Sequence, residues 1–100
     1  MAKTTAFDAS EYLDNDETIQ AFIAEAFETG DAKVIASSLG DVAKARGMSE
    51  LARQTGLSRE SLYKSLSADG NPAFSTILNV MKALGLNLEP HPKAKAPELA

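Results

Sequence analysis

One stretch, Met48 to Leu66 (MSELARQTGLSRESLYKSL), constrains the fold of this chain more than any other part of its sequence. It contains two short helical patterns separated by Gly56. That glycine stands where a helix can end through a left-handed residue, a conformation that only glycine adopts without a Cβ clash. Ser49 and Ser58 stand where a hydroxyl can cap the start of each helix. The stretch therefore predicts two short helices joined by a tight turn.

The second helix of this stretch has two unlike sides. Leu62 and Leu66, four residues apart, mark the side that we expect to be buried. The opposite side carries polar and charged residues: Arg59, Glu60, Tyr63 and Lys64. Two helices crossing at a glycine turn form the helix-turn-helix, whose second helix lies in the major groove of DNA. We therefore interpret this stretch as a DNA-binding motif.

The residue types predict how such a motif contacts DNA. Arg59 is the best candidate for reading a base, because its planar guanidinium can pair with O6 and N7 of guanine. Lys64 and Arg53 are expected to contact phosphates. Ser49 and Ser58 offer hydroxyls at helix N-termini, which suit phosphate oxygens.

Three side chains of the second helix have open alternatives. Arg59 could instead pair with Glu60 or face solvent. Tyr63 could stack on DNA or touch a phosphate, or it could bury its ring beside Phe74. Glu60 could accept a hydrogen bond from cytosine N4, select against wrong bases, or pair with Arg59.

The charge of the chain is unevenly distributed. The net charge of −4 is unfavourable for a nucleic-acid binder, but residues 1–31 hold eight acids and one base, while the other 69 residues hold nine bases and six acids. Residues 41–66 alone hold five bases and three acids. Binding to DNA depends on a local basic face rather than on the total charge. The asymmetry predicts two partners, one anionic and one cationic.

Two further helices are expected before this stretch. Asn15 or Asp16 can cap the first, and Asp31 can cap the second, which ends at Gly47. Gly40 interrupts the second helix at a cost of about 1 kcal/mol relative to alanine, which indicates either a close helix contact or a slight break. Apolar residues at helical spacing mark the buried sides of both: Ile19, Phe22, Ile23, Ala26, Phe27, Ile35, Leu39, Val42 and Ala43.

A last helix is expected after the turn formers SADGNP, with Asn71 as its cap and Pro72 as its first residue. Its apolar side comprises Phe74, Ile77, Leu78, Met81 and Leu84. Residues 86–88 alternate apolar and polar side chains and could form a short strand. We expect an all-α protein of five or six helices, divided into an acidic helical segment packed on the same domain (1–31), a helix-turn-helix domain (32–88) and a flexible tail (89–100).

Four blocks of the sequence together resemble a known family. They are FDASEYL at 7–13, ARGMSELA at 45–52, GLSRESLYKSLS at 56–67 and GNPAFSTILNVMKALGL at 70–86. They resemble the addiction-module antidote proteins, the HigA-like antitoxins among Xre/Cro-type helix-turn-helix proteins, over residues 7–88. One departure is Ser65, which stands where the wider family has an apolar residue, so that Leu66 is expected to provide that packing.

The resemblance implies a lambda-repressor-like fold and a cytoplasmic antitoxin without enzymatic activity. Such a protein neutralises a basic toxin of the RelE/HigB/ParE superfamily by direct binding. It also binds a palindromic operator as a homodimer and represses its own operon. Because of the charge asymmetry, the expected toxin contact is formed by acidic N-terminal residues, which could equally form a solvated helix surface: Asp14, Asp16, Glu17, Glu25 and Glu28. The rival is the C-terminal tail, where Lys93 and Lys95 would be poor partners for a basic toxin.

Other functional classes find little support in the sequence. There is no Ser/His/Asp set and no phosphate-binding glycine loop. The lone His91 and the absence of cysteine give no metal site, and no cofactor is expected. No apolar run approaches the ~20 residues that span a bilayer, and residues 1–10 do not resemble a signal peptide. Two alternatives remain: a phage-type repressor without a toxin, and a protein-sequestering module that has lost DNA binding.

Overall fold

The computed structural model describes residues 15–92. These residues form five helices: α1 (Asp16–Glu28), α2 (Ala32–Arg46), α3 (Met48–Thr55), α4 (Arg59–Ser65) and α5 (Phe74–Ala83). The all-helical prediction is confirmed, and residues 86–88 form no strand within the described range. The block FDASEYL at 7–13, the predicted toxin contact Asp14 and the tail residues 93–100 lie outside the described residues.

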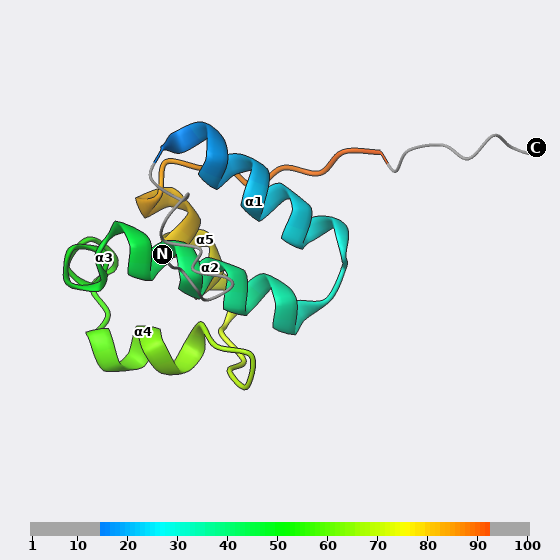
Figure 1. Ribbon diagram of the computed structural model, residues 1–100. Coiled ribbons are helices and arrows are strands. Elements are labelled where there is room, and N and C mark those ends of the chain that lie inside the picture. The colour runs from blue at the N-terminus through cyan, green and yellow to red at the C-terminus, as the bar shows by residue number, and fades with distance from the viewer. Residues whose placement is uncertain (1–14, 93–100) are drawn as a thin grey trace, which may run out of the picture.

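α1 and α2 form a hairpin, and the other helices pack around α2 and α3 (Figure 1). The Asn15 side chain caps α1 by accepting a hydrogen bond from the Thr18 N–H at 2.8 Å. Asp31 caps α2 in the same way, accepting from the Lys33 N–H at 2.9 Å. Both predicted helix starts are thus confirmed. Within the described part of the chain, no helix has the length and apolarity needed to cross a bilayer.

One hydrophobic cluster holds the helices together. Its most deeply buried large side chains come from α2, α4 and α5: Leu39, Val42, Leu62 and Val80. Ile19 and Ile23 of α1 join the same cluster. Burying a side chain of this size stabilises the fold by about 1.5–3 kcal/mol, so the position of each helix is determined by its apolar side.

Gly40 lies inside α2 at a close contact with the end of α4. A Cβ added at this position would lie 2.1 Å from the carbonyl oxygen of Leu66. The glycine therefore marks a close helix contact, which decides between the two explanations that the sequence left open. Because α4 can approach α2 only where no side chain intervenes, Gly40 positions α4.

The start of α5 differs from the prediction. The helix begins at Phe74 with Ala73 as its cap residue, so Asn71 and Pro72 precede it instead of starting it. Gly70 is held against α4, since a Cβ there would lie 2.2 Å from the Ser65 carbonyl oxygen. Asn71, Pro72 and Ala73 then complete the connection from α4 to α5. The first turn of α5 contributes no buried side chain, and Phe74, expected in the core, is 66% exposed.

Candidate functional site

The connection between α2 and α3 corrects one predicted cap. Gly47 adopts φ 112°, and α3 begins at Met48, directly after it, without a side-chain cap. Ser49 is therefore a residue within the first turn, and its side chain is exposed. The helix starts early because Met48, 5% exposed, is anchored in the core. Because Gly47 can adopt a positive φ, the chain changes direction between α2 and α3 within one residue.

The turn after α3 has the predicted form. Gly56 adopts the left-handed conformation at φ 78° and ψ 10°, and its N–H donates to the Ala52 carbonyl at 2.9 Å. The hydroxyl of Thr55 donates to the Leu51 carbonyl at 2.9 Å and accepts from the Leu57 N–H at 3.3 Å. These hydrogen bonds fix the angle at which the chain leaves α3.

α4 begins and packs as the sequence predicts. The Ser58 hydroxyl caps it by accepting from the Ser61 N–H at 3.0 Å. Leu62 and Leu66 are 0% and 3% exposed, which places one whole side of the helix in the core. Leu66 provides the packing that Ser65 cannot.

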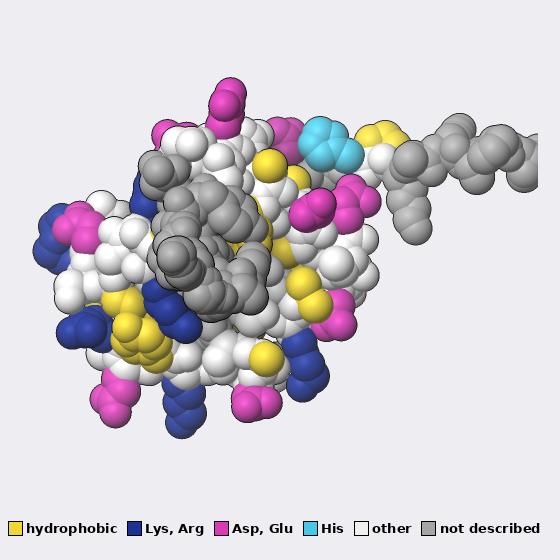
Figure 2. All heavy atoms as spheres, in the orientation of Figure 1, with side chains coloured by type: hydrophobic (Ala, Val, Ile, Leu, Met, Phe, Trp, Pro, Cys, Tyr) yellow, Lys and Arg dark blue, Asp and Glu magenta, His cyan; other side chains and the backbone are white. Residues whose placement is uncertain are grey.

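The opposite side of α4 faces outward. Arg59, Glu60 and Lys64 are all exposed, and none of them forms an ion pair within residues 15–92. The expected alternative of an Arg59–Glu60 pair is therefore wrong for this structure. Figure 1 shows α4 at the lower edge of the molecule, and Figure 2 shows basic and acidic side chains interspersed along that edge.

Tyr63 lies at the boundary between α4 and α2. It is 43% exposed, and Phe74 is exposed as well, so the alternative of a ring buried beside Phe74 is wrong. The Lys44 Nζ lies 6.0 Å from the centre of the Tyr63 ring, a cation–π distance. Lys44 thereby joins the face that α4 presents. The sequence analysis did not select it, because it is 19 positions away and no local spacing connects the two.

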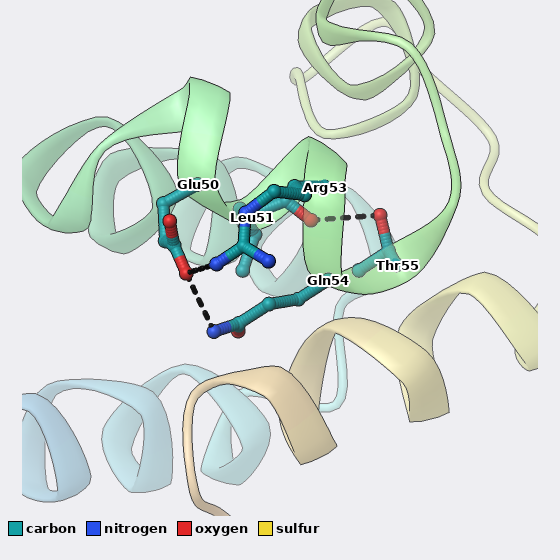
Figure 3. A network of polar contacts seen from close by, with 5 residues as sticks. All are labelled: Glu50, Leu51, Arg53, Gln54 and Thr55. Atoms are coloured by element: carbon teal, nitrogen blue, oxygen red, sulfur yellow. Dashed lines mark hydrogen bonds and ion pairs between the residues drawn. The ribbon is translucent and has the colours of Figure 1, made fainter.

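Arg53 on α3 is already paired. Its guanidinium forms an ion pair with the Glu50 carboxylate, which also accepts a hydrogen bond from Gln54 Nε2 at 2.9 Å (Figure 3). Arg53 remains exposed, but its charge is partly neutralised. Gln54, a second exposed side chain that the sequence analysis missed, is held beside it.

The predicted acidic residues of α1 lie away from α4. Asp16 is bound by Arg46 of α2, with 3.2 Å between Nη2 and Oδ1. Glu17, Glu25 and Glu28 are exposed and form no ion pair within the described residues. α1 and α4 lie on opposite sides of α2 (Figure 1). The structure therefore separates the two predicted surfaces.

These features define a small all-helical protein with an acidic helix on one side and a helix of mixed charge on the other. The chain belongs to the family described as "Probable addiction module antidote protein", whose family model matches residues 3–92. A protein of Haemophilus influenzae (strain ATCC 51907 / DSM 11121 / KW20 / Rd), described as uncharacterized, is 48% identical over 83 residues, which are 83% of this chain and 86% of the relative. No solved structure gives a significant match.

Proposed function

We propose that this protein is the antitoxin of a type II toxin–antitoxin module. In this proposal it binds and neutralises a basic toxin of the RelE/HigB/ParE class, and it represses its own operon by binding a palindromic operator as a dimer. Membership of the antidote family supports the antitoxin role. The arrangement of α3 and α4 supports the DNA-binding role, and we interpret it as a helix-turn-helix within a lambda-repressor-like fold.

The observation that carries the DNA-binding role is the two-sided character of α4. Leu62 attaches the helix to the core, while Arg59 and Lys64 project outward without intramolecular partners in the described chain. A helix attached on one side and free on the other can enter a major groove without loss of internal contacts.

The proposed DNA contacts have unequal roles. Arg59 is the proposed base-reading residue, and Lys64 and Lys44 are proposed phosphate contacts. Arg53 is a weaker phosphate contact, because its pairing with Glu50 must be shared or broken. The remaining proposed contacts are Ser49, Ser58, Glu60 and Tyr63.

The toxin is proposed to bind the acidic side of the molecule. Glu17, Glu25 and Glu28 offer a basic partner carboxylates that are unpaired within the described residues, whereas Asp16, also exposed, already forms an ion pair with Arg46. Because this side lies opposite α4, a toxin and an operator can be bound at the same time.

Two experiments test the proposal separately. A gel shift with the DNA upstream of the gene, compared with scrambled DNA, tests operator binding. Co-expression with the adjacent reading frame, followed by co-purification and a growth-rescue assay, tests the antitoxin role. A specific gel shift without growth rescue would identify a phage-type repressor. Rescue without a gel shift would identify a sequestering module, a function favoured by the acidic Glu60 among the bases of α4.

A further inference from the structure

A groove of about 500 Å³ runs between α1 and the chain that follows α5. Its large apolar lining residues are buried or half-buried, whereas its polar ones are exposed, which gives it an apolar floor and a polar rim. The floor includes Ile23, Phe27, Met81, Leu86 and Leu88. Ala24 lies at the α1 wall, and its side chain is small and exposed. The groove can therefore accept apolar side chains from outside.

The C-terminal wall of this groove is an unpaired strand-like segment. Leu86 and Leu88 are half-buried while Asn87 and Glu89 are exposed, the alternation of a β-strand. The Leu86 N–H donates to the Met81 carbonyl at 2.8 Å. Within residues 15–92, the backbone groups of 87–89 have no such partner. The segment predicted as a strand thus has the side-chain alternation of one and is paired with no strand among the described residues.

The acidic charge of the groove indicates which kind of partner binds there. Glu28 and Glu89 lie on the rim, and the lining includes no lysine or arginine. α1 itself carries four acids and no base. A second copy of the chain would bring two acidic helices together, which is unfavourable. A basic segment complements the Glu28 and Glu89 carboxylates on the rim and the acids of α1.

We propose that an extended, basic segment of the toxin docks in this groove as a strand paired with residues 86–89. Backbone hydrogen bonds to this edge supply affinity, while apolar side chains contact the floor and basic ones reach Glu28 and Glu89. This inference rests on the proposed antitoxin function and specifies the surface through which that function acts.

Two alanine-to-arginine substitutions test it. Ala24→Arg places a bulky cation in the groove, whereas Ala68→Arg adds the same group at an exposed position of the turn after α4, outside the lining. The affinity of each variant for the protein encoded by the adjacent reading frame is measured by calorimetry. We expect Ala24→Arg to weaken binding by about tenfold or more and Ala68→Arg by less than about twofold. Thermal melts establish that both variants are folded.

Amide hydrogen exchange on the unmodified protein provides a second measurement. The amides of Asn87, Leu88 and Glu89 should become protected when the complex forms. If both variants lose the same affinity and the amides of 87–89 stay unprotected in the complex, the toxin does not dock in the groove. The proposed antitoxin function would be unaffected by that result. Failure of the unmodified proteins to form any complex would overturn both. Concentration-dependent protection without the partner would assign the groove to a second copy and overturn the proposal.

Discussion

Gly40 of α2 lies so close to Leu66 that a Cβ at position 40 would be 2.1 Å from the Leu66 carbonyl oxygen. We expect Gly40→Ala to lower the free energy of unfolding by about 1–3 kcal/mol, because overpacking against backbone outweighs the gain of about 1 kcal/mol in helix propensity. Urea unfolding measures the change. Ser37→Ala, at a half-buried position of the same helix, is the control for propensity, and a stabilised Gly40→Ala would contradict the contact.

The two serines of the stretch should differ in their effects on stability. Ser58→Ala removes the hydroxyl that accepts from the Ser61 N–H and should destabilise the protein by about 0.5–2 kcal/mol. Ser49→Ala removes an exposed hydroxyl that caps nothing and should change stability by less than about 0.5 kcal/mol. Thermal or urea unfolding of both variants is the measurement. Equal losses would show that Ser49 also caps a helix.

Arg59→Ala should weaken operator binding by about 1–3 kcal/mol and relax the preference at one base pair. Titrations against the operator and against a panel of single-base variants measure both effects. Arg53→Ala is the matched control, since its guanidinium is paired with Glu50. Arg53→Ala should lose less affinity than Arg59→Ala. Its loss should be the same on operator and on scrambled DNA. If Arg59→Ala binds both DNAs as the parent protein does, Arg59 reads no base.

Glu60→Gln should tighten binding to any duplex by a few-fold at low salt, because it removes an unpaired carboxylate from the outer side of α4. Since the effect is electrostatic, it should shrink as salt rises. Fluorescence anisotropy across a salt series measures it. Weakened binding confined to the operator would instead show that Glu60 accepts a hydrogen bond from a base.

Asp41 should make stability depend on pH. Partial burial raises the pKa of this carboxyl above its ordinary value, and nearby Lys44 opposes the rise. The folded state therefore binds the proton more tightly than the unfolded state, so this contribution to stability is largest at acid pH and falls as pH rises through the raised pKa. Asp41→Asn should gain stability over the parent protein at pH 7 and lose that advantage near pH 3.5. Urea titrations at both values measure the difference, with Asp69→Asn controlling for the loss of one charge.

Local signals predicted a large part of this fold. Asn15, Asp31 and Ser58 cap helices as expected, and Gly56 ends α3 in the left-handed conformation. Each depends on neighbours within a few residues, which a sequence displays directly. The apolar side of α4 was equally clear, because helical spacing alone assigns Leu62 to the core.

The errors arise where distant parts of the chain decide the outcome. The predicted Ser49 cap is wrong because Met48 is anchored in the core and α3 starts two residues earlier than a cap at Ser49 requires. Phe74 has the correct spacing for a buried residue, but the core does not extend to the first turn of α5. Lys44 reaches Tyr63 only through the packing of α2 on α4. The groove beside α1 likewise joins residues about 60 positions apart, which no local pattern brings together.

The separation of roles on α4 bears on how such a protein can diversify. Leu62 and Leu66 hold the helix in place, whereas Arg59, Glu60 and Lys64 form no ion pairs within the described chain. Substitutions at these three outward positions leave the core untouched. If α4 reads DNA as proposed, related modules in one genome can acquire distinct operators through a few codon changes, and each protein then leaves the promoters of the other modules unbound.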